Sequence, residues 1–487
     1  MPHVPTTGHV SVGLRSERGP ILLSLMLATA LVALDATIIA TASATIAREL
    51  GGFDQLPWLF STYLLAQAVS TPVFGRLADV LGRKRLMLAG VGLFFAGSLL
   101  AGLAPTMGVL IAGRVLQGLG AGAVMPVSMT IAADIYTLEE RAKTQGYLAS
   151  VWAISAVVGP TLGGVFSQFT SWRWIFLVNI PLCALAAWML ARRYHEPARG
   201  GTREPIDYLG AALLAAGSTL LLLGLLEGGT RWAWGSLPSV VVFAAAVLLL
   251  AAFAVHSRRT RHPIVDLAIL RRRVVGVSTA VSGLVGVIVL GLSTYVPIYA
   301  QGVLGTGPLV AGFALAAMTI GWPLSASNAG RLYLRIGFRL TAVIGTSLAV
   351  VGTALTLLLA SGSSVLAVAG ACFVIGAGMG LTAVPTLIAA QSKASFTERG
   401  AVTGTNMFAR SLGSAVGVAV CGAIVNARTT VGADGTPEGP GLMSAIHLVF
   451  ALLVAVTAVL VVLAALMPAD LQEARERRAQ TAGAAPA

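Results

Sequence analysis

Charged side chains are scarce in this chain. Asp, Glu, Lys and Arg together make up 10% of the 487 residues, whereas hydrophobic residues make up 56%, and the mean hydropathy is +0.85. A soluble globular domain carries about 25% charged residues. The shortage of charge therefore excludes a soluble protein and indicates an integral membrane protein.

Cysteine and the short motifs of catalysis are also nearly absent. Cys183, Cys372 and Cys421 lie far apart within apolar runs, so we expect neither a disulfide nor a metal site. The sequence contains no GxxxxGK[ST] phosphate loop, no HExxH and no GxSxG. Their absence argues against ATP hydrolysis and against an intramembrane enzyme, and we expect no cofactor.

The chain consists mainly of long apolar runs. A helix of about 18 or more apolar residues can cross a hydrocarbon core of about 30 Å. Fourteen runs predict an all-α integral membrane protein with fourteen transmembrane helices. The runs are 21–44, 57–75, 86–104, 109–131, 145–167, 174–191, 207–227, 237–255, 274–298, 307–328, 340–360, 365–389, 401–425 and 443–467.

The basic residues predict the orientation of these helices. If the N-terminus is inside, the predicted cytoplasmic segments hold 26 of the 32 Lys and Arg residues, as cytoplasmic loops should. We therefore expect both termini on the cytoplasmic side of the cell membrane. The net charge of +13 is spread over many short loops, so it indicates orientation and contact with membrane lipids rather than nucleic-acid binding.

One charged segment occurs twice. GRLADVLGRKR begins at Gly75 after the second run, and a weaker copy, GRLYLRIGFR, begins at Gly330. Without two extra runs and their loops, the copies are about 200 residues apart, the length of a six-span unit. We predict a cytoplasmic segment (1–20), a six-helix bundle (21–193), two inserted helices with flanking cytoplasmic loops (194–272), a pseudo-symmetric second six-helix bundle (273–467) and a cytoplasmic tail (468–487).

Six motifs occur in order along the chain. They are LDATIIATASATI (34–46), GRLADVLGRKR (75–85), GRVLQGLGAG (113–122), GPTLGG (159–164), WRWIFLVNIP (172–181) and ARSLGSAVGVA (409–419). With them the chain resembles the major facilitator superfamily, specifically its fourteen-span drug:proton antiporters of the EmrB/QacA type. Ala36 and the stretch around Ser43 depart from the commoner residues of the first motif. The resemblance implies a secondary transporter that works by alternating access.

The first charged segment is a candidate conformational latch. Its residues are Gly75, Arg76, Asp79, Gly82, Arg83, Lys84 and Arg85. Its glycines permit a tight loop and close helix approach, and Asp79 can pair with the cations or cap a neighbouring helix. A plain charged turn is the alternative. The resemblance implies a latch between the two halves, and Leu334 in place of Asp79 predicts a single latch on the N-terminal half.

Three ionisable residues lie deep in the runs, Asp35, Arg114 and Arg410, and such residues are functional candidates by default. At about 1.5 Å per residue, Asp35 and Arg114 fall at similar depths. Burial favours the protonated carboxyl and a nearby arginine favours its release, which predicts Asp35 as a proton carrier. A structural ion pair is the alternative, and the resemblance also links both positions to proton coupling. For Arg410 we leave open packing, carbonyl pairing, an anionic substrate group and sharing of Asp35.

Two further sets of residues are candidates. GPTLGG, with Gly159, Pro160, Gly163 and Gly164, joins a helix-kinking proline to small residues. It is either a packing surface or, as the resemblance implies, a flexible interface that blocks proton leak. Glu227 is predicted to be interfacial. Side chains that could line a substrate cavity are Gln67, Gln117, Tyr295, Trp322, Asn406 and Arg410.

Together these features predict a monomeric, proton-driven exporter of lipophilic drugs or other amphiphilic small molecules, with a role in antibiotic resistance. The alternative is an exporter or flippase of an endogenous lipid or secondary metabolite, because two deep arginines against one aspartate do not make an evidently cation-selective cavity. A receptor or scaffold without transport is disfavoured by Asp35 and Arg114.

Overall fold

The computed structural model describes residues 13–51, 55–196, 205–229, 232–431, 437–438 and 441–468. The N-terminal elements are α1 (Gly19–Ile38), the 3-10 turn η1 (Ile39–Thr41), α2 (Ser43–Leu50), α3 (Leu56–Leu81), α4 (Arg83–Gly102), α5 (Met107–Ile135), α6 (Leu138–Phe169), α7 (Trp174–Leu177) and α8 (Asn179–Arg193). The middle helices are α9 (Tyr208–Glu227), α10 (Leu237–Arg259) and α11 (Leu267–Arg271). The C-terminal helices are α12 (Arg273–Gly302), α13 (Pro308–Leu357), α14 (Val365–Lys393), α15 (Arg399–Asn426) and α16 (Leu442–Ala465).

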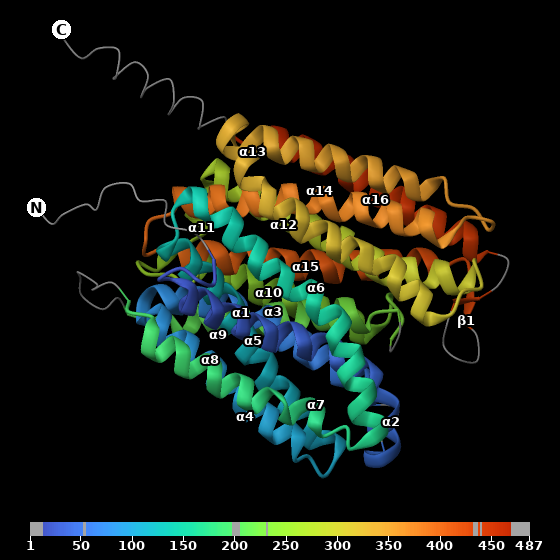
Figure 1. The fold of residues 1–487 in the computed structure, drawn as a ribbon, viewed down its shortest axis with the longest axis horizontal. Coiled ribbons are helices and arrows are strands. Elements are labelled where there is room, and N and C mark those ends of the chain that lie inside the picture. Colours follow the sequence, from blue (N-terminus) through green and yellow to red (C-terminus); the bar gives the residue numbers. More distant parts are fainter. Residues whose placement is uncertain are drawn as a thin grey trace, which may run out of the picture.

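The long helices lie side by side along the longest axis of the molecule (Figure 1). In this view α12, α13, α14 and α16 form the upper part, and α1, α4, α5 and α8 lie below them. Two short strands, β1 (Thr430–Val431) and β2 (Pro437–Glu438), pair antiparallel between α15 and α16. Apart from this short strand pair the described elements are helical, which confirms the helical membrane fold predicted from the sequence.

Within the described residues, twelve helices are long and apolar enough to cross a membrane, against the fourteen predicted. The difference has two sources. α3 is not among the twelve, and it carries Gln67, Arg76 and Asp79 among its 26 residues. α13 is a single element of 50 residues where two runs were predicted, although its backbone leaves the helical region at Gly337.

The two copies of the charged segment turn at equivalent positions. Gly82 is the eighth residue of the first copy and has φ 110°, and Gly337 is the eighth residue of the second copy and has φ 88°. Residues with side chains rarely adopt these values, whereas glycine does so readily. Gly82 separates α3 from α4, and Gly337 divides α13. The two copies of the charged segment therefore share the same backbone turn.

Two of the predicted runs are interrupted in the structure. The run at 21–44 is divided among α1, η1 and α2, and the run at 174–191 is divided between α7 and α8 around Val178. The short helix α11 between α10 and α12 was not predicted from the sequence. The first interruption follows Asp35 by four residues, so the regular α-helix gives way to a 3-10 turn just beyond the buried carboxylate.

Small residues bring neighbouring helices close together. A Cβ atom on Gly120 of α5 would lie 2.6 Å from the backbone nitrogen of Phe94 on α4, and one on Gly378 of α14 would lie 2.6 Å from that of Ala349 on α13. Lipid tails are as apolar as leucine, so helices in a bilayer associate largely through such close packing. The buried apolar clusters divide accordingly, with one large cluster in α12 to α16 and another mainly in α1 to α8.

The two halves of the chain meet along two helix pairs, α3 with α15 and α6 with α13. In the first pair a Cβ on Gly400 would lie 2.2 Å from the carbonyl oxygen of Gly75. In the second pair a Cβ on Gly146 would lie 2.7 Å from Cβ of Ser327. Helix α9 packs against both α3 and α15, the two helices of the first crossing.

Segments predicted to be cytoplasmic gather at one end of the bundle, here called the arginine-rich end. Arg18 donates to the carbonyl oxygen of Ile135 (2.8 Å) and pairs with Glu140 (3.1 Å). Arg272 pairs with Glu398 (2.8 Å). The first contact joins the start of α1 to the α5–α6 turn, and the second joins the segments before α12 and α15. Arg399 at the start of α15 pairs with Asp134 at the end of α5 (2.8 Å), so these segments meet at one end, as the basic-residue pattern predicts for loops on one side of the membrane.

Candidate functional site

A buried ion pair joins α1 to α5. Arg114 Nη1 donates to Asp35 Oδ2, and each side chain is 1% exposed. The same nitrogen donates to Gln117 Oε1 (2.9 Å), and Arg114 Nε donates to the carbonyl oxygen of Leu59 (3.1 Å). The guanidinium also lies 4.1 Å from the centroid of the Tyr63 ring. The two deep residues expected to meet from their depths are therefore in direct contact.

The second carboxylate oxygen of Asp35 is held by amides. Gln117 Nε2 donates to Asp35 Oδ1 (3.0 Å) and to Ser98 Oγ (2.9 Å), and Asn179 Nδ2 donates to the same Asp35 oxygen (3.4 Å). Gln117 was predicted to line a substrate cavity, but here it orients the carboxylate. Asn179 was not predicted, although it lies in the WRWIFLVNIP motif at the first residue of α8.

The GPTLGG segment of α6 packs against α1 just beyond Asp35. A Cβ on Gly159 would lie 2.1 Å from Thr37 Oγ1, and one on Gly163 would lie 2.4 Å from the carbonyl oxygen of Ile38. Gly164, in contrast, has no atom within 4 Å of its added Cβ. Gly159 and Gly163 therefore form the contact surface, Pro160 lies inside the helix between them, and Gly164 faces open space.

Gly163→Ala is expected to be destabilising and Gly164→Ala to be nearly neutral. The first substitution forces backbone of α1 and α6 apart, and overpacking of this kind costs about 1–3 kcal/mol. The second adds a methyl group to an open surface, where changes are usually within about 0.5 kcal/mol. Thermal unfolding of the two variants in the same detergent compares them, and equal Tm values would contradict the packing role of Gly163.

Asp79 at the end of α3 caps the first turn of α15. Its Oδ1 accepts from the N–H of Gly400 (3.0 Å), its Oδ2 accepts from the N–H of Ala401 (2.8 Å), and Arg83 Nη2 donates to Oδ1 (2.9 Å). The Asp79 and Arg83 side chains are fully buried. A carboxylate at a helix N-terminus interacts favourably with the unpaired N–H groups and the helix dipole, so Asp79 ties the two halves together at the arginine-rich end.

Asp134 completes this contact from α5. Arg83 Nε donates to Asp134 Oδ2 (3.1 Å), and Arg399 Nη1 on α15 donates to Asp134 Oδ1 (2.8 Å). The Arg83 guanidinium also donates to the carbonyl oxygen of Phe396 and lies 3.9 Å from the centroid of its ring. We call Asp79, Arg83, Asp134 and Arg399 the Asp79 cluster. Sequence reasoning missed Asp134 because it stands alone at the end of an apolar run.

The other residues of the candidate latch have lesser contacts. Arg76 Nη1 donates to the carbonyl oxygen of Thr397 (3.1 Å) across the two halves. Lys84 Nζ donates to the carbonyl oxygen of Ala191 (2.7 Å) within the N-terminal half. Arg85 is exposed. The contact between halves is therefore concentrated on Arg76 and the Asp79 cluster.

The second copy of the charged segment makes a different contact. Tyr333 hydroxyl donates to the carbonyl oxygen of Leu138 at the start of α6, while Leu334, at the position of Asp79, packs among apolar side chains. The α6 N-terminus has its own capping box between Thr137 and Glu140. The N-terminus of α6 is thus capped within its own half, whereas that of α15 depends on Asp79 from the other half.

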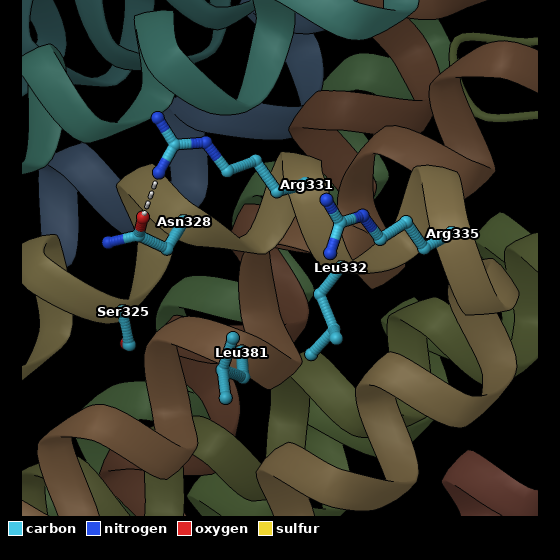
Figure 2. Close-up of a pocket in the computed structure, with 6 residues that line it drawn as sticks. All are labelled: Ser325, Asn328, Arg331, Leu332, Arg335 and Leu381. Atoms are coloured by element: carbon cyan, nitrogen blue, oxygen red, sulfur yellow. Dashed lines mark hydrogen bonds between the residues drawn. The ribbon is translucent and has the colours of Figure 1, made fainter.

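A hollow of about 320 Å³ lies beside this second copy. It is lined by Ser325, Asn328, Arg331, Leu332, Arg335 and Leu381 from α13 and α14. Figure 2 shows the two arginine side chains one helical turn apart on α13, with Arg331 Nη1 donating to Asn328 Oδ1 (3.2 Å). This hollow is separate from the cavity between the two halves.

Glu398 at the start of α15 is held by Arg272, whose two terminal nitrogens donate to it at 2.8 and 2.9 Å. These hydrogen bonds outweigh partial burial and lower the pKa of Glu398 from 4.5 to about 2. The stabilisation is therefore present above about pH 4.5 and is lost as the pH falls toward 2.

Glu398→Gln is expected to lower the free energy of unfolding at pH 7 by at most about 1 kcal/mol, because the Arg272 side chain is 48% exposed and the pair is screened by water. The difference between variant and wild type should shrink as the pH is lowered through 4 toward 2. Thermal unfolding at a series of pH values measures this, and a difference that grows on acidification would contradict the assigned pKa direction.

A central cavity of about 360 Å³ lies between the two halves. Three of the predicted cavity residues, Gln67, Trp322 and Arg410, line it. The rest of its wall comprises Thr29, Met125, Ser128, Met129, Gln145, Leu148, Ala149, Trp152, Val289, Met318, Thr319, Pro323, Ala383, Val384, Leu387, Met407 and Ser411. Both halves therefore contribute to one cavity.

The other predicted cavity residues lie elsewhere. Tyr295 is buried in the apolar cluster of the C-terminal half. Asn406 Nδ2 donates to the carbonyl and hydroxyl oxygens of Ser278, both at 3.0 Å, and so joins α15 to α12. Glu227 is the last residue of α9 and is 9% exposed. The described residues contain no group of three or more His, Cys, Asp or Glu side chains that could hold a metal ion.

Comparisons with known proteins agree with this architecture. The model of the Major Facilitator Superfamily matches residues 25–418. The "Multidrug transporter protein MdtP" of Bacillus subtilis (strain 168) is 32% identical over 417 residues, 86% of this chain and 77% of that protein. The "Efflux pump FUS6" of Gibberella fujikuroi is 30% identical over 414 residues, 83% of this chain and 75% of that protein.

Among solved structures, the crystal structure of the human organic anion transporter MFSD10 (TETRAN) is similar with a TM-score of 0.64. The match covers 92% of this chain and 99% of that chain at 16% identity, so it concerns the fold alone. The family match spans most of the chain, and both relatives are aligned over more than two thirds of their length. The chain belongs to the major facilitator superfamily and is a multi-pass membrane transporter.

Proposed function

We propose that this transporter is a proton-driven exporter of lipophilic drugs or other amphiphilic small molecules, with Asp35 as the proton carrier. The observation that carries the proposal is the buried Asp35–Arg114 pair outside, but close to, the central cavity. Asp35 lies six residues beyond Thr29, which lines the cavity, or about 9 Å along α1. A substrate and a proton can therefore bind at separate places in the N-terminal half.

The pair has the chemistry that a carrier needs. Burial favours the neutral carboxyl, and the arginine favours the carboxylate, so movement of Arg114 relative to Asp35 changes the proton affinity. Gln117 and Asn179 hold one carboxylate oxygen, and the Gly159–Thr37 contact keeps α6 against α1 nearby. The names of the relatives, a multidrug transporter and an efflux pump, support export of drugs or similar compounds.

We further propose fourteen transmembrane helices, as in the EmrB/QacA type. A straight α13 of 50 residues would be about 75 Å long, more than twice the hydrocarbon thickness of about 30 Å. The turn at Gly337 therefore divides α13 into two crossings, and α3, which packs along α5, is the other addition. On this assignment the arginine-rich end faces the cytoplasm, as the positive-inside rule requires.

The Asp79 cluster is the proposed latch for alternating access. It joins α3 and α5 of one half to α15 of the other at the arginine-rich end, so this end opens only when those contacts break. At the crossing of α6 and α13, the hydroxyl group of Tyr333 donates to the carbonyl oxygen of Leu138 in the equivalent place, and this hydrogen bond involves no carboxylate. The asymmetry agrees with one functional latch.

Proteoliposomes with a trapped pH dye test the proposal. A panel of lipophilic cations and anionic amphiphiles is added with and without an imposed ΔpH. The expected result is substrate-evoked proton movement, and accumulation of that substrate that depends on ΔpH, in vesicles that contain the protein. Protein-free vesicles and a protonophore are the controls. If no compound moves protons or accumulates against its gradient, the proton-coupled function is wrong.

The second candidate, an exporter of an endogenous acidic lipid or metabolite, is favoured by one observation. Arg410 is the ionisable residue of the cavity wall, and the described residues of that wall include no carboxylate.

A further inference from the structure

The central cavity has an unusual distribution of charge. Among its described lining residues, Arg410 is the one ionisable side chain, and the remaining polar groups are the neutral side chains of Gln, Ser and Thr. The buried carboxylates Asp35, Asp79 and Asp134 of the N-terminal half are each paired with an arginine, and none of them lines the cavity. The wall is therefore positively charged without compensation from the protein.

The guanidinium of Arg410 is held weakly by the protein. Its Nε lies 3.5 Å from Ser282 Oγ, at the limit of a hydrogen bond, and its Cζ is 5.8 Å from the centroid of the Trp322 ring. No acidic side chain of the described residues pairs with it, whereas Arg83 and Arg114 each have a carboxylate partner. A guanidinium carries five N–H donors, and most of those of Arg410 are left for a ligand.

We propose that the cavity binds amphiphiles with an acidic group, a carboxylate or a sulfonate, and that Arg410 pairs with that group. The inference rests on the proposed function, because it takes the central cavity as the transport site. An anionic oxygen pair matches the planar fork of a guanidinium and forms charge-assisted hydrogen bonds, which are about twice as strong as neutral ones.

The rest of the wall suits the apolar body of such a compound. Four methionines, Met125, Met129, Met318 and Met407, and two tryptophans line the cavity from both halves. Methionine side chains are flexible and polarisable and adapt to ligands of different shape. The volume of about 360 Å³ lies in the range of small-molecule pockets, so the ligand is a compact amphiphile rather than a two-chain lipid.

The same wall disfavours lipophilic cations. A cation in the cavity would face the charge of Arg410 with no carboxylate on the wall to offset it, and like charges in a low-dielectric space repel strongly. A neutral compound with the same apolar body gains the methionine contacts but not the ion pair. The expected order of affinity is therefore acid, then neutral compound, then cation.

Three fluorescent or competing probes separate these cases. 8-Anilinonaphthalene-1-sulfonate carries a sulfonate, N-phenyl-1-naphthylamine has the same ring system without it, and ethidium is a lipophilic cation. Binding is measured by probe emission excited through tryptophan, with purified protein in phosphatidylcholine nanodiscs and empty nanodiscs subtracted. We expect saturable sulfonate binding to the wild type that decanoate displaces and ethidium does not.

Variants assign the binding to Arg410. Arg410→Gln should weaken sulfonate binding at least about tenfold while N-phenyl-1-naphthylamine binding changes less than about twofold. Arg410→Lys keeps the charge and should retain most of the affinity. Arg428→Gln, the same substitution at an exposed arginine outside the cavity wall, is the matched control. Unchanged sulfonate binding in Arg410→Gln would overturn the proposal. If that variant does not fold, the selectivity of the wild type decides, because displacement by ethidium as strong as by decanoate also overturns it.

Two further comparisons are needed. One separates a free acid from a lipid headgroup as the ligand, and the other separates this inference from the proposed function. A soluble short-chain phosphatidylglycerol should not displace the sulfonate probe; displacement by it and not by decanoate would assign Arg410 to a lipid headgroup and overturn the proposal. The binding assay uses no gradient. If acids bind and need Arg410 but no proton moves in proteoliposomes, the proposed function is refuted and this inference stands. If ethidium drives proton movement and acids do not bind, this inference is refuted and the proposed function stands.

Discussion

Asp35→Asn is expected to abolish substrate-evoked proton movement in proteoliposomes, with a decrease of at least about a hundredfold, the range expected when a positioned proton-transfer group is lost. Asparagine has the size of aspartate and can keep the amide contact with Gln117, but it has no proton to exchange. The measurement is the response of a trapped pH dye to a compound that moves protons in the wild type.

Binding separates coupling from general damage in this variant. Asp35 does not line the central cavity, so equilibrium binding of the same compound should stay within about threefold of the wild type. Glu227→Gln is the matched control, because Glu227 is a buried carboxylate in a long helix and lies outside both the ion pair and the cavity wall. Proton movement that persists in Asp35→Asn would refute the carrier role.

Asp35→Asn also leaves Arg114 without its anionic partner in a buried site. Removing one member of a buried pair costs about 3–5 kcal/mol, so a lower Tm is expected along with the loss of coupling. Asp35→Glu keeps the titratable group and partly restores the pair. Recovery of proton movement in Asp35→Glu at a Tm similar to that of Asp35→Asn would assign the loss to the proton and not to stability.

Asp79→Asn is expected to shift the transporter toward a form that is open at the arginine-rich end. The substitution removes the charge that caps α15 and pairs with Arg83. Loss of a buried pair of this kind is worth about 3 kcal/mol, which is about a hundredfold in the ratio of latched to open forms. Transport requires the protein to alternate between the latched and the open form, so a strong bias toward the open form should lower the transport rate.

Pulsed electron paramagnetic resonance measures the shift. Spin labels at Lys143 and Ser392, exposed residues on opposite halves near this end, report the separation of the halves. The natural cysteines Cys183, Cys372 and Cys421 are buried, which limits background labelling. Asp79→Asn should add a longer distance, and Glu139→Gln, which removes an exposed charge at the same end, should not. Identical distance distributions in Asp79→Asn and wild type would contradict the latch.

Much of the fold could be predicted because it depends on local composition. Long apolar runs must be helical to satisfy their backbone hydrogen bonds in lipid, so the helices follow from the runs at nearly every position. The equivalent turns at Gly82 and Gly337 were marked by repeated letters around each glycine. The exceptions are α3, whose polar residues lower its hydropathy, and α13, whose two predicted parts form one element.

The candidate site was predicted unevenly for a physical reason. Asp35, Arg114 and Arg410 could be found because a charge in an apolar run is costly and therefore conspicuous. Asp134 and Asn179 could not, since Asp134 stands next to the end of α5 and Asn179 is the first residue of α8, and polar residues are common at helix ends. Gln117, Tyr295 and Asn406 were assigned to the cavity by residue type, although side-chain direction places each of them elsewhere.

The sequence by itself determined the membrane environment, the helical class, the repeat and the identity of the deep charged residues, because each depends on hydropathy and spacing along the chain. Only the tertiary structure decided which charges are paired. Asp35 meets Arg114 and Asp79 meets the N-terminus of α15, residues separated by 79 and by 321 positions, while Arg410 faces the cavity without an acidic partner among the described residues. These pairings depend on which helix faces meet across the bundle, and hydropathy along one helix carries no information about its neighbours.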